Sequence, residues 1–423
     1  SPGCEHKRAP PSQWIPGRNS KASITHDGVT RTFLVRLPAK YDHTKPTSLV
    51  LNFHGWGDNS SYSSDIGLDG VIDDAGWVLV SPDGMSDFDG TWTSGGSMDW
   101  GSWNGGGTTL SPGPEGSTCT PEHDGTYCYK SCAARPQGCD KDGCDWTTCH
   151  DDIGFVASLL DHLSDELCLD LDRFHVTGCS NGGILAYELA MTSDARIQGR
   201  FASVAPVAGN VHLGFARTPP HPIHVLDIHG IRDTAVPLNE TEPGRAVSAD
   251  GWIYTPRRTL FLGFRQANGC TGDGMHFPTK YDGRGPGLYC VEVGECSFRT
   301  VRCAWDGNHA TPGDGWSDTS DKGLFGVYLI RDFFLDHPRR QIRPNSTNGK
   351  SWGALPFVLI GLVLLVLMGG MLFLRKFPFA RENPRALFHS RSRNVTLRDN
   401  VIAGSRGELE KESELVATWV SKK

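Results

Sequence analysis

The sequence predicts an α/β fold with a mostly parallel sheet covered by helices on both faces. Short apolar segments alternate with longer helix-forming segments, a pattern typical of this class. One segment, 49–53, is apolar except for Asn52, as expected of a strand buried on both faces. No internal repeat is present. Strands are expected at about 48–53, 77–81, 173–177, 202–208 and 223–229, and helices at about 152–167, 183–192, 257–267 and 319–335.

The chain is expected to begin with a loose arm, followed by one large domain. Residues 1–28 are polar, contain several prolines and lack periodicity, so they form an arm that Cys4 could tie down. Residues 31–37 alternate between polar and apolar side chains, as an edge strand does. The main domain spans 29–340.

A long insertion at 85–149 interrupts the strand and helix pattern. It holds six of the thirteen cysteines, at positions 119, 128, 132, 139, 144 and 149. A loop this long is unusual unless it is functional or cross-linked, so disulfides are expected, with 15 possible connectivities for six cysteines. Zinc is the alternative, with Cys139, Cys144, Cys149 and His150 as ligands, but the spacing does not match Cys-x-x-Cys pairs. The position of the insertion is one a lid would occupy.

Aromatic side chains in this insertion have two interpretations. Trp92, Trp100 and Trp103 lie among glycines and polar residues, where they either stack on a sugar or aromatic group or form the small core of the insertion. At its end, Asp151 and Asp152 precede an apolar helix, which favours a helix cap with a favourable dipole over a metal or acid pair.

Cysteine content and glycosylation motifs predict an oxidising compartment. Thirteen cysteines are too many for an ordinary cytosolic enzyme. Asn59, Asn239 and Asn345 are each followed two residues later by Ser or Thr, as glycosylation acceptors are.

A membrane span is predicted near the C-terminus. Residues 355–374 are about 20 uncharged, mainly apolar residues, enough for a helix of about 30 Å across a bilayer. Arg375 and Lys376 follow at once, which places the tail, 375–423, in the cytoplasm. Residues 341–354 would be the juxtamembrane linker. A removed lipid-anchor signal is the alternative, although such signals end the chain. This topology requires a signal peptide, which we expect to have been removed ahead of Ser1.

Charge argues against a nucleic-acid partner. The formal net charge is −7, and the domain has no basic stripe. The sequence calls for no cofactor and no metal, and it does not define an oligomeric state.

A serine at a strand-to-helix turn is the first candidate for chemistry. The run GCSNG at 178–182 follows the apolar segment 174–177 and precedes a helix-forming segment, which places Ser180 in a strained turn. The neighbouring Cys179 is expected to be a packing residue or a disulfide partner of Cys168. His175, His224 and His229 lie in strands or at their ends and are expected to be packed or supporting residues.

Two further residues complete a pattern of nucleophilic catalysis. Asp233 follows the apolar strand at 223–229, and His309 lies in a loop rich in glycine and proline. A serine hydroxyl needs an imidazole to accept its proton, and the imidazole needs a carboxylate to fix its tautomer. The order serine, aspartate, histidine is the one that α/β-hydrolases use. Asp227 is a rival carboxylate inside the apolar strand.

Four segments together resemble the secreted α/β-hydrolase esterases related to polyhydroxybutyrate depolymerases and feruloyl esterases of the carbohydrate esterase type. They are His54-Gly55, GCSNGG at 178–183, HGIRD at 229–233 followed by Val236-Pro237, and His309 followed by Pro312-Gly313. The resemblance spans about residues 30 to 335. It implies that Ser180 is the nucleophile, His309 the general base and Asp233 the orienting acid. It also implies an oxyanion hole formed by the backbone N–H groups of Asn181 and Trp56. Such esterases often carry Trp where this chain has Thr311, so Thr311 is a candidate pocket residue.

The leading functional hypothesis is a membrane-anchored extracellular or lumenal ester hydrolase. Its substrates would be esterified polysaccharide, hydroxycinnamoyl or polyester material, on the resemblance alone. A serine peptidase of the same fold is the enzymatic alternative. A binding module that has lost activity is the alternative from another class, and the presence of Ser180, Asp233 and His309 argues against it.

Overall fold

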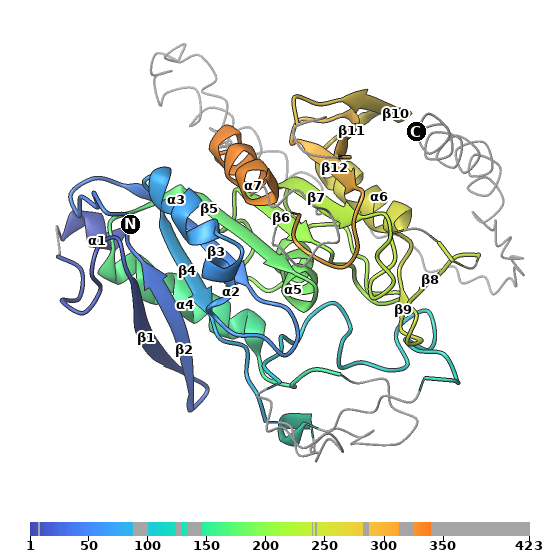
Figure 1. The fold of residues 1–423 in the computed structure, drawn as a ribbon, viewed down its shortest axis with the longest axis horizontal. Helices are drawn as coiled ribbons and strands as arrows, with labels where there is room; N and C mark the ends of the chain where they lie inside the picture. The colour runs from blue at the N-terminus through green and yellow to red at the C-terminus, as the bar shows by residue number, and fades with distance from the viewer. Residues whose placement is uncertain are drawn as a thin grey trace, which may run out of the picture. The chain divides into compact units, whose positions relative to one another are not determined.

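One large sheet forms the centre of the fold (Figure 1). The structure, a computed structural model, describes residues 1–6, 9–87, 100–123, 129–132, 146–238, 240–241, 243–281, 287–312 and 325–339. Within them, ten strands lie in the order β1-β2-β4-β3-β5-β6-β7-β12-β11-β10. Their bounds are β1 Asn19–His26, β2 Val29–Arg36, β3 Thr47–Phe53, β4 Val78–Pro82, β5 Leu169–Cys179, β6 Ser203–Val207, β7 His224–Gly230, β10 Thr271–Pro278, β11 Tyr289–Glu295 and β12 Thr300–Trp305.

The centre of the sheet is parallel and its two edges are antiparallel. Strands β4, β3, β5, β6, β7 and β12 pair in parallel, as the alternation of apolar and helical segments predicts. Hairpins β1–β2 and β10–β11–β12 extend the sheet on either side. Strands β8 (Ala246–Val247) and β9 (Ile253–Tyr254) form a separate small sheet.

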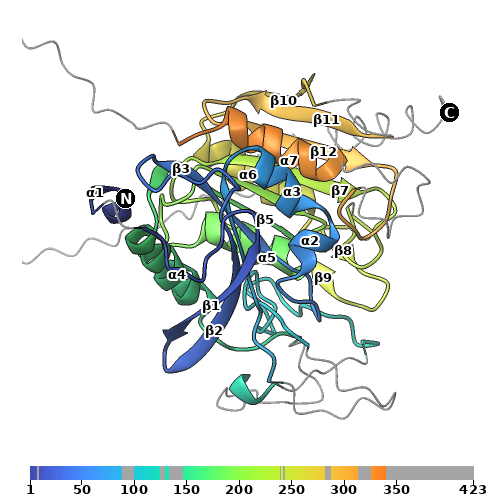
Figure 2. The same ribbon diagram turned by 60° about the vertical axis from the view of Figure 1, so that its left-hand side comes forward.

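Helices cover both faces of the sheet, as predicted. Helices α4 (Asp152–Glu166), α5 (Asn181–Met191) and α6 (Arg257–Ala267) pack on one face. Helices α3 (Leu68–Asp74) and α7 (Phe325–Asp336) pack side by side on the other (Figure 2). Each face of the sheet packs against its helices in a separate hydrophobic core, and β3 contributes to both because its alternate side chains point to opposite faces. Leu49 and Leu51 lie in the core beneath α4, α5 and α6, and Val50 lies in the core beneath α3 and α7.

The expectation of a loose N-terminal arm over 1–28 is wrong for its second half. Strand β1 pairs with β2 along its whole length, from Asn19 to His26. No apolar pattern marks this strand, because it is an edge strand made mostly of polar residues. The first half contains α1 (Pro2–Glu5), and Cys4 forms a disulfide with Cys168, so the tie expected at Cys4 is confirmed.

Disulfides also settle the alternatives at three other cysteines. Cys168 pairs with Cys4, so the alternative that Cys179 is its disulfide partner is wrong. The other alternative, a packing role for Cys179, is confirmed, because this residue is buried in the core. Within the insertion, Cys132 pairs with Cys149, which removes Cys149 as a zinc ligand. Two further bridges, Cys270–Cys296 and Cys290–Cys303, hold the β10–β12 edge.

Several predicted segments lie outside the described residues. They are Trp92, Cys128, Cys139, Cys144, Asn239, Asn345, residues 319–324 of the last expected helix, and the predicted linker, span and tail at 341–423. Among the residues that are described, no helix combines the length and hydropathy needed to cross a bilayer.

Candidate active site

Ser180 lies on a sharp turn between β5 and α5. Its φ of 57° and ψ of −121° are in a region that side-chain-bearing residues rarely adopt. Glycine is required on both sides, because a Cβ at Gly178 would lie 2.6 Å from the carbonyl oxygen of Gly182, and one at Gly182 would lie 2.1 Å from that of Phe53. The Ser180 N–H donates to Val207 at the end of β6 (2.9 Å). This geometry is that of a nucleophile elbow.

His309 lies between Ser180 and Asp233 and is within hydrogen-bond distance of both. Its Nε2 is 2.7 Å from Ser180 Oγ, and its Nδ1 is 2.8 Å from Asp233 Oδ2. The sheet explains the meeting of three residues so far apart in sequence. Strands β5, β7 and β12 run parallel, so the loops after their carboxyl ends emerge at the same edge. The His309 side chain is 27% exposed, whereas that of Asp233 is fully buried.

Backbone N–H groups as well as His309 hold the Asp233 carboxylate in place. Its Oδ1 accepts the N–H groups of Ala235 (3.0 Å) and Val236 (2.8 Å), which fixes the plane of the carboxyl group. Burial by itself raises the pKa of Asp233. Hydrogen bonds and charge from His229 and His309 outweigh that effect and hold the pKa well below its ordinary value. The carboxylate therefore stays ionised beside His309.

His229 is a supporting residue whose partner the sequence did not reveal. Its Nε2 lies 2.7 Å from the carbonyl oxygen of Val236 and 3.3 Å from Asp233 Oδ2. Because a carbonyl oxygen only accepts, Nε2 carries the proton and faces the Asp233 carboxylate. The only sequence signal was its place at the end of an apolar strand, four residues before Asp233.

The rival carboxylate, Asp227, has a different partner. It is fully buried in β7 and forms an ion pair with Arg257, the first residue of α6. Its Oδ1 also lies 3.8 Å from His229 Nδ1. Asp227 is thus separated from His309 by His229 and Asp233, and its charge is compensated inside the core.

The loop after β3 carries Trp56, one of the two expected oxyanion donors. His54 fixes this loop: the N–H of Gly84 donates to Nε2 (2.8 Å), so the proton lies on Nδ1, which donates to the Gly55 carbonyl (2.6 Å). Burial lowers the pKa of His54, which favours this neutral form. Next to Trp56, the N–H of Gly57 donates to Gly101 (2.9 Å).

Asn181, the other expected donor, opens helix α5. Its backbone N–H lies in the first turn and has no acceptor within the helix, so it faces outward at the positive end of the dipole. Its buried side chain binds the backbone of Trp103 twice. The N–H of Trp103 donates to Asn181 Oδ1 (2.7 Å), and Asn181 Nδ2 donates to the Trp103 carbonyl (2.9 Å).

The candidate pocket residues differ in their exposure and contacts. The prediction that Trp103 lines the substrate pocket is wrong. Its side chain is 0% exposed, packs edge-on against Phe53 and donates from Nε1 to the His54 carbonyl (3.0 Å), so it belongs to the core. Thr311 is 2% exposed, and its hydroxyl bonds that of Tyr62 (2.8 Å), so it ties the histidine loop to α2 (Tyr62–Asp65). Trp100 is half-buried and packs against Trp56, with ring centroids 4.2 Å apart and ring planes tilted by 32°.

The acidic pair at the start of α4 acts structurally, as predicted. Asp151 caps the helix by accepting the N–H of Gly154 (2.8 Å). Asp152 forms a buried ion pair with Arg31 (2.6 Å) and accepts the N–H of Asn104 (2.7 Å). Asp151 also lies near His26 and Asp27, the one grouping of possible metal ligands found among the described residues. The Arg196 guanidinium, 3.1 Å from Asp151, already provides a cation there.

Comparisons with known proteins find sequence relatives for part of the chain. No family model matches the chain. Feruloyl esterase C of Emericella nidulans is 29% identical over 159 residues, covering 38% of this chain and 50% of that protein. The probable feruloyl esterase C of Aspergillus flavus is 29% identical over 166 residues, with the same coverage. The chain therefore spans about half the length of the curated relatives it matches.

One solved structure is described as a thermostable esterase. It covers 76% of this chain and 63% of its own, with a TM-score of 0.42 and 12% identity. The sheet order and the nucleophile elbow on their own define the fold class. The chain has an α/β-hydrolase fold, and its sequence is similar to those of fungal feruloyl esterases.

Proposed function

We propose that this protein is a serine carboxylic ester hydrolase that works through an acyl-enzyme. The observation that carries the proposal is the continuous chain of contacts from Ser180 Oγ through His309 to Asp233. The contact from Ser180 Oγ to His309 Nε2, 2.7 Å, is within the range of proton transfer, and the contact from His309 Nδ1 to Asp233, 2.8 Å, orients the imidazole. The sequence similarity to feruloyl esterases supports the same reaction class.

Acylation follows from the positions of these groups. Ser180 Oγ attacks the carbonyl carbon of the ester while His309 Nε2 accepts the hydroxyl proton. Asp233 stabilises the resulting imidazolium at Nδ1. The N–H groups of Asn181 and Trp56 bind the oxyanion of the tetrahedral intermediate. When the intermediate collapses, His309 protonates the leaving alcohol, and the acyl group remains on Ser180. Water then attacks the acyl carbon while His309 takes its proton. When this second intermediate collapses, the bond from the acyl carbon to Ser180 Oγ breaks, His309 returns the proton to Oγ, and the carboxylic acid leaves.

Hydroxycinnamoyl esters, esterified polysaccharides and polyesters are the proposed substrates. Support for the first comes from the names of the similar fungal proteins. The contact between His309 and the buried Asp233 supports ester chemistry without choosing among these acyl groups.

Reaction with a fluorophosphonate tests the nucleophile. The full-length protein should be labelled at Ser180, and Ser180→Ala should be neither labelled nor active. Assays with p-nitrophenyl butyrate, methyl ferulate, acetylated xylan and casein then test the substrate class. Labelling that persists in Ser180→Ala would refute the nucleophile, and cleavage of casein alone would make the protein a peptidase.

The proposed enzyme is a type I single-pass membrane protein with its catalytic domain extracellular or lumenal. Support comes from the apolar segment 355–374 with Arg375 and Lys376 behind it, and from the disulfides. Protease added to intact cells or sealed vesicles should remove the catalytic domain and spare an epitope placed after Lys423. Release of the intact protein by alkaline carbonate would contradict the anchor.

A further inference from the structure

We infer that the cysteine-rich insertion builds the oxyanion hole and that Tyr129 is a positioning residue for it. This inference rests on the proposed function, because it concerns how the two proposed donors are held. The relevant part of the insertion, here called the clasp, consists of residues 100–103, 129–132 and 146–149. The clasp contacts the side chains of both donor residues, Asn181 and Trp56.

On the side of Asn181, the clasp provides both a donor and an acceptor. The two hydrogen bonds between the Asn181 carboxamide and the Trp103 backbone leave this side chain one orientation. Because Asn181 is the first residue of α5 and is fully buried, its backbone N–H is fixed with it. The clasp thus determines the direction of one proposed oxyanion donor.

On the side of Trp56, the clasp surrounds the indole ring. Trp56 Nε1 donates to the hydroxyl of Tyr129 (2.8 Å), and the Trp100 ring packs against the indole at a tilt, with centroids 4.2 Å apart. Trp146 meets it edge-on at 6.3 Å. With the Gly57 N–H bound to Gly101, the loop is held from the side chain and from the backbone. Of these contacts, the hydrogen bond to the Tyr129 hydroxyl is the one that a minimal substitution, Tyr129→Phe, removes while keeping the aromatic ring.

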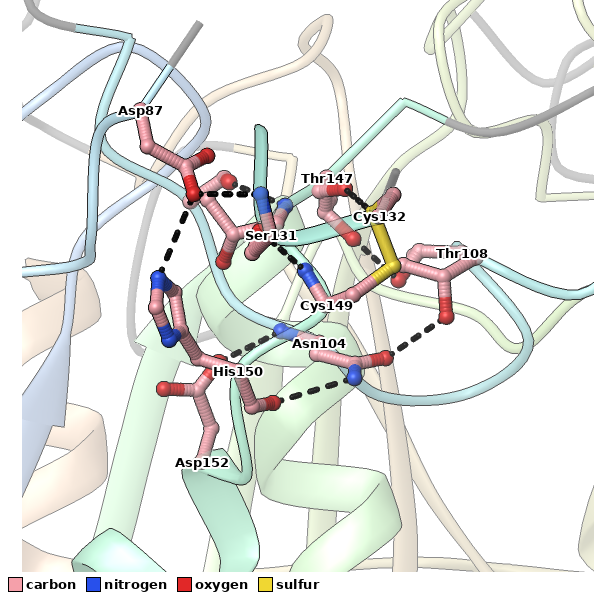
Figure 3. Close-up of a disulfide and its surroundings, with 12 residues drawn as sticks. Asp87, Asn104, Thr108, Ser131, Cys132, Thr147, Cys149, His150 and Asp152 are labelled. Carbon is pink, nitrogen blue, oxygen red and sulfur yellow. Dashed lines mark hydrogen bonds and ion pairs between the residues drawn. A yellow bond between two sulfur atoms is a disulfide. The ribbon is translucent and has the colours of Figure 1, made fainter. Parts of the chain in front are cut away.

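Tyr129 precedes a short helix that the Cys132–Cys149 disulfide holds. Figure 3 shows this disulfide and the residues around it. The N–H of Cys132 donates to the Tyr129 carbonyl (2.9 Å), in the turn that enters the short helix Lys130–Cys132. The N–H of Ser131 donates to Asp87 (2.8 Å), whose carboxylate lies 3.4 Å from His150. Ser131 Oγ accepts the N–H of Cys149 (2.9 Å). Since Cys149 lies two residues before Asp151, the cap of α4, the disulfide connects the turn that carries Tyr129 to the start of that helix.

This arrangement assigns the insertion a function other than that of a lid. An oxyanion hole lowers the barrier only if its donors are already aimed at the position where charge develops. The Trp56 N–H lies between two glycines, whose backbone dihedrals are the least restricted of any residue, so its direction depends on the contacts that hold the loop. The clasp supplies the rigidity, and Tyr129 acts through Trp56 without contacting substrate.

The test is Tyr129→Phe in the full-length protein, with Tyr41→Phe as the matched control. The Tyr41 hydroxyl also accepts one N–H, from Cys168 (3.1 Å), but at the opposite end of β5. For Tyr129→Phe we expect kcat on p-nitrophenyl butyrate to fall about tenfold with KM nearly unchanged, less than the loss of a whole donor. Labelling of Ser180 by a fluorophosphonate should slow by a similar factor. The control should keep the parent kcat at a similar melting temperature.

A second pair of variants tests the disulfide. Removing Cys132 and Cys149 together, as Cys132→Ala with Cys149→Ala, should lower kcat in the same way as Tyr129→Phe. Removing Cys270 and Cys296, which lie on the β10–β12 edge, should lower stability and leave kcat unchanged. If the first of these variants does not fold, Tyr129→Phe decides alone.

The two possible failures are distinguishable. If the parent protein hydrolyses the ester but Tyr129→Phe matches Tyr41→Phe in kcat and labelling rate, the positioning role is overturned and the proposed function stands. A parent protein that is neither active nor labelled at Ser180 overturns both.

Discussion

At the scale of single residues, Asp227 and Asp233 show how two carboxylates close in sequence take different roles. Asp227 lies within β7 and is neutralised by Arg257 across the core. Asp233 lies in the loop beyond the strand, where two histidines and two backbone N–H groups surround it. The difference comes from position along one strand, since the strand interior faces the core and its carboxyl end faces the site.

Asp233→Asn and Asp227→Asn should therefore fail in different ways. The first should fold and lose as much as about four orders of magnitude in kcat, because an amide favours the wrong His309 tautomer. The second should lose roughly 3 to 5 kcal/mol of unfolding free energy, because it leaves Arg257 buried without its counter-charge. Ester assays and urea titrations of both variants check this. A stable, inactive Asp227→Asn beside an active Asp233→Asn would mean that the acid is Asp227.

His175 should make the protein less stable in mild acid. It is fully buried between Trp77 and Phe334, with Arg173, His224 and His337 as the charged or titratable groups that act on it. Burial, helped by these neighbours, lowers its pKa to about 3. Below pH 6.5 the unfolded chain gains a proton at His175 that the folded protein does not take up, so stability falls as pH falls.

The expected size of this effect is about 2 kcal/mol between pH 7 and pH 5. Urea midpoints of the parent and of His175→Gln at both pH values measure it. His175→Gln should be less stable than the parent at pH 7. Between pH 7 and pH 5 it should lose about 2 kcal/mol less unfolding free energy than the parent loses. Parallel losses in the two proteins would show that His175 is not the group that titrates.

At the scale of elements, the contact between α5 and the end of β3 determines how the serine is presented. Gly182 allows the helix to approach the carbonyl of Phe53, the residue just before the His54–Trp56 loop. The same close approach therefore places the elbow beside the proposed oxyanion loop.

Gly182→Ala should destabilise the protein by roughly 1 to 3 kcal/mol and lower esterase activity, because a methyl group there overlaps backbone that cannot move aside freely. Gly70→Ala is the matched control, since Gly70 lies in α3 with no atom within 4 Å of the added Cβ. That change should stabilise the protein by up to about 1 kcal/mol through helix propensity. Urea unfolding and ester assays give both quantities, and similar effects from the two changes would contradict the steric argument.

At the scale of the whole molecule, the disulfides act over very different lengths of chain. Cys4–Cys168 joins residues separated by 164 positions and fixes the N-terminus against the start of β5, whereas Cys290–Cys303 joins neighbouring strands 13 positions apart. The longer bridge removes more conformational freedom from the unfolded chain.

Removing Cys4–Cys168 by paired alanine substitution should cost about 5 kcal/mol, and removing Cys290–Cys303 about 3 kcal/mol, in the chain-entropy description. Urea unfolding of the two double variants measures the difference. Equal losses, or a larger loss for the short bridge, would show that local packing and not loop length sets the contribution.

The sequence by itself determined the features that depend on local pattern. Continuous apolar segments predicted the parallel strands, and the glycines around Ser180 predicted the elbow, because a tight turn restricts residue type directly. The order of Ser180, Asp233 and His309 was readable because the chain passes the same edge of a parallel sheet after each strand.

Only the tertiary structure decided which distant residues meet. The partner of Cys168, the burial of Trp103, the pairing of β1 and the contact between Tyr129 and Trp56 all join segments far apart in the chain. A cysteine, a tryptophan or a polar edge strand has the same local signature whichever partner it finds. The choice depends on the summed packing of the folded chain, and no local pattern records it.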